Sequence, residues 1–282
     1  MRAALACSLG VMGLIFAAAT TAAASCPAVG EGAAGPLPGG TVRADFGAIP
    51  EACPGSEVVV RLRGVLVLAG DAPDYYRSFE GSLMVRARHA IADRTWLSFA
   101  FDAGDYLYVE NAGLGASQLS VGAPTVGIYR TLLEANAVSA AVYVRALLPL
   151  ETSRHVGFQT GLELGGAFRA TPGARWVLDG GAALTVPTDL AGGQVHGHLI
   201  PVGLIEGWGA IRRWVAVGLG VTVRAELAPN PSLLSATPRA SVRATIKERF
   251  WLAALVEAPI LGQFLGPDRT DLVAGVFAGY TP

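Results

Sequence analysis

The sequence predicts an all-β fold, a single antiparallel up-and-down transmembrane β-barrel of about 12 strands. Three observations predict it. The chain carries few charged residues, its strand-length segments alternate apolar with small or polar residues, and its N-terminus has the pattern of an export signal. Together these features indicate a protein that is exported and then surrounded by lipid.

Composition sets the first limits. Charged residues make up 15% of the 282 residues and hydrophobic residues 52%, whereas about 25% of an ordinary soluble domain is charged. The formal net charge is -1, and no stripe of basic residues interleaved with aromatic ones is present. The composition therefore excludes nucleic acid as a partner.

Residues 1–24 have the pattern of a signal peptide. Arg2 supplies a positive charge, residues 9–19 form an apolar run, and Ala22 to Ala24 supply the small residues of a cleavage site. A membrane anchor is the alternative, but the apolar run is too short to favour a spanning helix. We expect this segment to be removed on export.

Residues 25–55 form an extension rich in glycine, alanine and proline, which holds Cys26 and Cys53. These are the only cysteines left after cleavage, and the oxidising periplasm favours a disulfide between them. The alternative is a lipoprotein with lipid on Cys26, although the residues before Cys26 lack the large aliphatic typical of such sites. The extension is interpreted as a disordered leader with one disulfide, and a plug of the barrel lumen is the alternative.

The barrel, residues 56–282, is predicted from alternation. No stretch after Ser25 has about 18 uninterrupted apolar residues, so no helical span is expected. In 214–227 the odd positions are valine, leucine or alanine, whereas the even positions include glycine, threonine, Arg224 and Glu226. The segments 155–169, 235–247 and 78–89 alternate in the same way. Such alternation indicates one face toward lipid and one toward a lumen; a soluble barrel or sandwich is the alternative.

Tryptophans follow basic residues at several predicted strand starts. The sequence has Arg175-Trp176, Arg213-Trp214 and Arg249-Phe250-Trp251, at intervals that fit one hairpin each, and Trp96 stands two residues after Arg94. Because membrane barrels place aromatic side chains at the lipid–water interface, these tryptophans are predicted to form a girdle.

The segmentation follows from these signals together with the prolines near strand ends. Strands are predicted at 56–69, 77–89, 95–103, 117–130, 137–149, 154–169, 174–187, 194–209, 213–227, 234–247, 250–261 and 270–280. The short turns near 90–94, 131–136, 170–174, 210–212 and 248–249 are expected on the periplasmic side. The connections 70–76, 104–116, 150–153, 188–193, 228–233 and 262–269 are then extracellular. The loop 104–116 is the longest and is a candidate constriction.

Over residues 56 to 282 this pattern resembles bacterial outer-membrane β-barrel proteins, although no specific motif is shared. Such barrels usually end on an aromatic residue that the insertion machinery reads, and Tyr280 takes that place before Thr281 and Pro282. The resemblance implies the cell outer membrane of a Gram-negative bacterium, reached through the periplasm. It also implies contact with membrane lipid, lipopolysaccharide and the insertion machinery.

Charged residues on the small-residue face are the candidate lumen lining. The pore-lining candidates are Arg145, Glu163, Arg224, Glu226, Arg239, Arg243 and Glu257, and the same face carries Arg169, Asp179 and Glu206. Their mixed signs favour internal ion pairs over a strongly selective pore. Arg239, Arg243 and Lys247 form a positive ladder, which is predicted to pair with Glu226 and Glu257; facing an anionic solute is the alternative.

Chemistry beyond a barrel has little support in the sequence. His196 and His198 are weak metal-ligand candidates, and with His155 they lie near predicted extracellular ends. No hydrolase, zinc-protease or phosphate-loop motif is present, and no cofactor is expected. The sequence thus favours a passive pore or small-solute transporter for small polar solutes. A non-conducting structural or surface-binding barrel is the alternative, and a rim-site enzyme is less favoured.

Overall fold

The computed structural model describes most of the chain after residue 56. The described ranges are 57–69, 76–111, 114–120, 124–135, 137–148, 160–173, 175–191, 194–212, 214–228, 233–246, 250–258, 261–262 and 269–280. The predicted signal peptide, the extension 25–55 and the predicted disulfide between Cys26 and Cys53 lie outside these ranges. Within them, no helix has the length and apolar character needed to cross a membrane.

The described residues form one antiparallel sheet of 15 strands. The first seven strands are β1 (Glu57–Ala69), β2 (Tyr76–Ala92), β3 (Thr95–Asn111), β4 (Leu114–Ser120), β5 (Thr125–Ala135), β6 (Val138–Leu147) and β7 (Thr160–Gly173). The others are β8 (Trp176–Ala191), β9 (Gln194–Gly197), β10 (Ile200–Arg212), β11 (Val215–Glu226), β12 (Leu233–Ile246), β13 (Phe250–Glu257), β14 (Leu261–Gly262) and β15 (Arg269–Tyr280).

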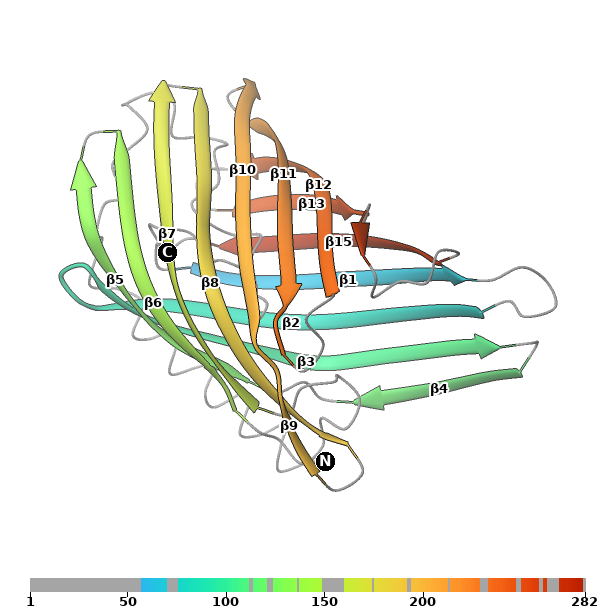
Figure 1. Cartoon of the computed structure of the whole chain (residues 1–282). Coiled ribbons are helices and arrows are strands. Elements are labelled where there is room, and N and C mark those ends of the chain that lie inside the picture. Colours follow the sequence, from blue (N-terminus) through green and yellow to red (C-terminus); the bar gives the residue numbers. More distant parts are fainter. Residues whose placement is uncertain are drawn as a thin grey trace, which may run out of the picture.

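Sequential neighbours pair along most of the sheet, which is an up-and-down topology. The path of pairings runs β10-β11-β12-β13-β15-β1-β2-β3-β5-β6-β7-β8-β9, and β10 also pairs with β8. The first and last long strands, β1 and β15, are antiparallel partners from Val58 and Tyr280 to Ala69 and Arg269. In Figure 1, β8, β10 and β11 pass in front of β1 and β2, to which they run crosswise, so the sheet curls strongly.

A strand overlaps each of the predicted ranges, but two ranges are not single strands: 117–130 contains the end of β4 and the start of β5, and 194–209 contains β9 and most of β10. The predicted loop 104–116 is also wrong. β3 continues to Asn111, and β4 starts at Leu114 and pairs back onto β3. The register between β2 and β3 shifts where Leu83 faces Gly104 and Met84 faces Asp102. Gly104 therefore marks a bulge in a continuing strand, which is a frequent use of glycine inside strands.

The predicted loop 188–193 is also mostly strand. β8 extends to Ala191, and β9 pairs with its last residues, from Thr188 facing Gly197 to Ala191 facing Gln194. Both corrections have the same effect, because two predicted connections become hairpins that lengthen β3 and β8.

Buried and exposed side chains alternate along the strands and define two faces. In β5 the pattern begins at Thr125 as buried, exposed, buried, exposed, and it continues to Leu132. We call the face with the buried side chains the inner face and the other the outer face. The outer face is rich in exposed leucine, valine and isoleucine, including Leu164 and Leu219. This alternation confirms the pattern predicted in 214–227 and, within the predicted 155–169, in the described residues 160–169.

The short turns share one hydrogen bond pattern. We call the strand ends at the turns β2–β3, β5–β6, β7–β8 and β10–β11 the short-turn rim. At each turn, a backbone carbonyl accepts a hydrogen bond from the N–H of the strand that follows the hairpin in the sheet. The bonds are Thr131 N to Arg94 O at 2.9 Å, Thr171 N to Ala137 O at 2.8 Å, Ala210 N to Arg175 O at 2.9 Å and Thr245 N to Trp214 O at 2.9 Å. Successive hairpins are thus tied to one another at this rim.

Candidate functional site

The inner face carries the charged and aromatic residues that distinguish this sheet, and it is the candidate functional site. Its charged side chains come from β6, β7, β8, β10, β12 and β13, where strand alternation points them to the same side as alanine and glycine. Because charge is costly to bury without a partner, the contacts of these groups determine what the face can do.

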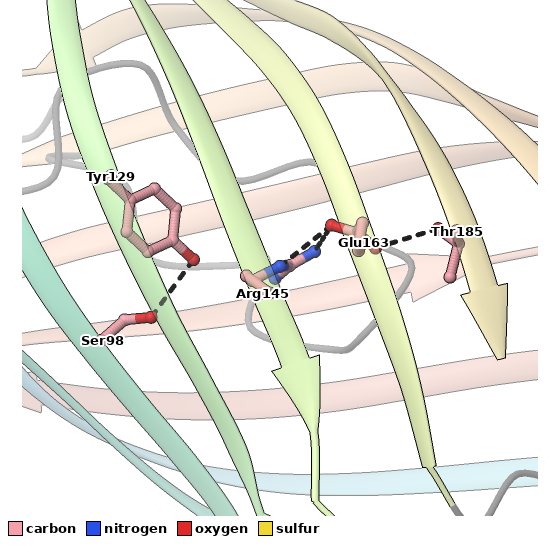
Figure 2. Close-up of polar contacts among 5 residues, drawn as sticks. All are labelled: Ser98, Tyr129, Arg145, Glu163 and Thr185. Carbon is pink, nitrogen blue, oxygen red and sulfur yellow. Dashed lines mark hydrogen bonds and ion pairs between the residues drawn. The ribbon is translucent and has the colours of Figure 1, made fainter.

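The first cluster joins β6, β7 and β8. Arg145 donates from Nε to Oε1 of Glu163 at 2.9 Å, its Nη2 contacts the same carboxylate, and Thr185 donates to Glu163 Oε2 at 3.0 Å. Arg145 and Glu163 face each other in the strand register. Figure 2 shows this chain of contacts, with the hydrogen bond between Ser98 and Tyr129 at 3.2 Å beside it. Glu163 is 0% exposed and Arg145 2% exposed, so the pair is removed from water.

Aromatic side chains pack beside this cluster. The rings of Tyr129 and Tyr143 stack with centroids 5.5 Å apart, and the guanidinium carbon of Arg145 lies 5.3 Å from the centroid of Tyr143. Gly165 is the register partner of Tyr143. A Cβ added at Gly165 would lie 2.6 Å from Cζ of Tyr143 and 2.8 Å from Cβ of Ala183. Glycine at this position therefore makes room for the tyrosine ring, an arrangement known for aromatic residues across glycine in sheets.

Gly165→Val should consequently lower the free energy of unfolding by about 1–3 kcal/mol, the usual range for overpacking a filled interior. Gly166→Val is the matched control, because a Cβ there meets only the carbonyl oxygen of Ala141, at 3.6 Å. Urea unfolding of the two refolded variants measures the difference. Equal losses in both variants would contradict the packing of Tyr143 against Gly165.

The second cluster is a row of register partners across five strands. Arg169 on β7 donates hydrogen bonds from Nε and Nη2 to Oδ1 and Oδ2 of Asp179 on β8, at 2.8 and 2.9 Å. Asp179 faces Glu206 on β10, and the row continues through Gly220 on β11 to Arg239 on β12. Asp179 and Glu206 are therefore neighbouring acids, and the row places an arginine on either side of them, Arg169 at one end and Arg239 at the other.

Arg239 reaches Glu206 across an intervening strand. Its Nε lies 3.0 Å from Oε1 of Glu206, and its Nη1 lies 3.5 Å from Oε1 of Glu257 on β13. In the strand register, Gly220 lies between Glu206 and Arg239. A Cβ added at Gly220 would lie 2.9 Å from Cβ of Glu206. The missing side chain of Gly220 leaves the space through which the Arg239–Glu206 pair forms.

A third group surrounds Trp208 and Trp251. The guanidinium carbon of Arg243 lies 4.7 Å from the ring centroid of Trp251, which is a cation–π contact. Trp208 packs over Gly218, and Trp251 packs over Gly279. Both tryptophans belong to a buried apolar cluster with Leu255, Phe277 and other inner-face residues.

The structure places the predicted pore-lining residues on the inner face but not in one group. Arg145 and Glu163 form the first cluster, and Arg239 and Glu257 belong to the second. Arg243 lies against Trp251, whereas Arg224 is exposed near the far end of β11. Pairing of the ladder with Glu257 is confirmed for Arg239, but Glu226 instead contacts Nδ1 of His198 at 2.6 Å. That these residues line a solute path stays a prediction.

The histidine pair does not share a strand. β9 ends at Gly197, so His196 lies on β9 while His198 lies beyond it and contacts Glu226. Within the described part of the chain, no group of three or more histidine, cysteine, aspartate or glutamate side chains is arranged to hold a metal ion. The structure therefore does not strengthen the prediction that His196 and His198 are metal ligands.

Two of the four tryptophans predicted to form a girdle are exposed on the outer face, and two are not. Trp176 and Trp214 are 62% and 59% exposed on the outer face, as an interface girdle requires, but Trp96 and Trp251 are 3% and 2% exposed on the inner face. Period-2 parity points both of them inward, because Trp96 shares its face with Ser98 and Trp251 shares its face with Glu257. The repeated interval marks strand starts, but it does not tell which face a residue occupies.

Sequence reasoning placed Arg169, Asp179 and Glu206 inside but did not single them out as a site. It missed Ser98, Tyr129, Tyr143 and Thr185 altogether. Their positions in the alternation carry the signal, because Tyr143 has the same parity as Arg145 and Thr185 the same parity as Asp179. What alternation does not give is the partner of each group on the neighbouring strands.

Several solved structures share this fold. An outer-membrane channel from Pseudomonas putida F1 aligns with a TM-score of 0.56 and 14% identity, covering 85% of this chain and 99% of that one. The translocator domain of the autotransporter NalP from Neisseria meningitidis gives 0.55 and 10%, covering 80% and 88%. The porin NanC gives 0.50 and 5%, covering 79% and 100%. No protein-family model and no curated protein sequence matches this chain. The likeness is to outer-membrane β-barrels as a fold.

Proposed function

We propose that this chain spans the outer membrane of a Gram-negative bacterium as a closed barrel of about 12 strands, with its interior filled by its own side chains. In this proposal it is a non-conducting barrel, which acts through its rims and its outer surface. One observation carries the proposal: most of the inner-face charges, from Arg145 and Glu163 to Arg239 and Glu206, are paired and withdrawn from water, while the outer face exposes large apolar side chains.

The pairing of β8 with β10 supports closure, because with it each strand from β10 around to β8 has a neighbour on both sides. A closed sheet leaves no unpaired edge, which is what a membrane requires of strands. The exposed apolar side chains of the outer face would be unfavourable in water over so large an area, but they suit lipid.

Burial of the charges supports a filled interior. Glu163 is 0% exposed and Asp179 1% exposed, so no water-filled path touches either carboxylate. The clusters around Tyr143 and Trp251 also occupy inner-face space that an open pore would leave to solvent. Ion pairs that join neighbouring strands then serve to hold the wall together.

A passive pore for small polar solutes is the second candidate. Arg224 is exposed on the inner-face side of β11, and Glu257 keeps 21% of its side chain accessible, so water reaches the interior from the end of the barrel opposite the short-turn rim. The porin and the channel named above have the same fold, which is compatible with such a role.

Conductance of the refolded protein in a planar lipid bilayer separates the two candidates. We expect no discrete current steps from protein whose folding is verified by heat-dependent gel mobility. Ohmic steps would overturn the non-conducting proposal, and the variant Arg239→Ala/Arg243→Ala would then change the anion preference if these residues line the path. Unchanged selectivity would remove both arginines from the conduction mechanism.

A further inference from the structure

The short-turn rim combines exposed arginines with tryptophans that are exposed on the outer face. Arg130 on β5, Arg175 just before β8 and Arg212 at the end of β10 are all exposed. Trp176 and Trp214 are exposed on the outer face at the same rim. Cations and indole rings therefore lie together where the apolar surface ends.

Backbone contacts hold part of this surface in place. The carbonyl of Arg175 accepts a hydrogen bond from the N–H of Ala210 at 2.9 Å. Ala210 is two residues before Arg212, so this bond places Arg175 beside the end of β10. Trp176 lies over its register partner Gly209, where an added Cβ would be 2.6 Å from Cζ3 of the indole. The indole is thus held against the sheet, in the residue that follows Arg175.

The charge of this rim favours an anionic partner. Its described acids are Asp93 and Glu134, and Oε2 of Glu134 lies 3.9 Å from Nε of Arg94. No ion pair of Arg130, Arg175 or Arg212 occurs in the part of the chain that the structure describes. Three exposed arginines therefore remain available to a ligand at this rim.

We propose that the short-turn rim binds anionic phospholipid headgroups through Arg130, Arg175 and Arg212, with Trp176 and Trp214 at the headgroup level. The inference rests on the proposed transmembrane barrel. Indole rings favour the lipid–water interface, and guanidinium groups bind phosphate with two parallel hydrogen bonds. A net negative headgroup is favoured over a zwitterionic one, whose own cation offsets its phosphate. This rim then faces the phospholipid leaflet, in agreement with the periplasmic side predicted for the short turns.

The two exposed tryptophans supply the reporter for a direct test. The full chain is refolded into vesicles of equal parts phosphatidylglycerol and phosphatidylcholine, with only one of the two lipids brominated in each preparation. Bromine quenches tryptophans that contact the lipid, whereas the buried Trp96, Trp208 and Trp251 give an unquenched background. Stronger quenching by brominated phosphatidylglycerol is expected, corresponding to a preference of about two- to fivefold near the rim. The preference should weaken as salt is added.

The variant Arg130→Gln/Arg175→Gln/Arg212→Gln should quench equally with either lipid, whereas the corresponding triple lysine variant should keep most of the preference because it keeps the charge. If the triple glutamine variant fails to fold, Arg175→Gln alone, next to Trp176, should reduce the preference. Equal quenching in the folded unmodified protein would overturn this inference and leave the barrel intact. Absence of quenching by either lipid would instead show that the outer face does not meet lipid, and the proposed function itself would fail.

Discussion

Glu163→Leu is expected to destabilise the protein by about 3–5 kcal/mol, the range found when one partner of a buried ion pair is removed. The carboxylate of Glu163 holds the guanidinium of Arg145 through Nε at 2.9 Å and accepts from Thr185 at 3.0 Å. Without it, Arg145 keeps its charge at 2% exposure, and its remaining aromatic neighbours do not replace an anion.

The measurement is urea unfolding from short-chain phosphatidylcholine vesicles, followed by tryptophan fluorescence. The control is Arg145→Met/Glu163→Leu, which removes both charges and keeps similar volume. Replacing a buried pair by apolar residues is often neutral or stabilising, so the double variant should regain most of the lost stability. If the double variant is as unstable as the single one, the pair is not what holds β6 and β7 together.

Leu219→Arg should lower stability by about 2–4 kcal/mol, as arginine does on the lipid face near the middle of a membrane barrel. Leu219 is 70% exposed, and its register partners Gly207 and Ala240 place it well inside the sheet, away from both ends of β11. In water, the same exposed leucine would tolerate arginine within about 0.5 kcal/mol. The substitution therefore tests directly whether lipid covers the outer face.

Leu227→Arg is the matched control. Leu227 is also exposed, but it follows the last residue of β11, and the penalty for arginine falls to about 0–1 kcal/mol near the interface. Vesicle insertion yield and urea unfolding of the two variants give the comparison. Equal, small effects at both positions would indicate a soluble sheet and would contradict the membrane-spanning proposal.

Much of the fold follows from period-2 alternation. The strands with one clear polar or small face, such as β7 and β11, lie where they were predicted, and their faces are correctly assigned. The physical reason is that every second side chain meets the same environment along a strand. Strand ends are predicted less well than strand interiors. The glycine at position 104 suggests a loop, but it lies at a bulge within β3, so the predicted strand is too short.

The contacts of the site could not be predicted in the same way. Arg239 was expected to pair on adjacent strands, and it does reach Glu257, but it also reaches Glu206 over Gly220. That contact depends on a side chain being absent on the strand between them, which only the register reveals. The inward positions of Trp96 and Trp251, by contrast, follow from parity, because Trp96 shares its face with Ser98 and Trp251 shares its face with Glu257. The repeated interval between the tryptophans carries no information about the face.

The carbonyl ties at Arg94, Ala137, Arg175 and Trp214 suggest how such a sheet could change size during evolution. Each tie involves only one hairpin and the strand after it, so the same unit is repeated along the chain. Duplicating or deleting a whole hairpin would leave every remaining tie with an equivalent neighbour. The circumference of the sheet can then change by one hairpin at a time through gene duplication. The inner ion pairs join particular strands, so each such change requires new ion pairs.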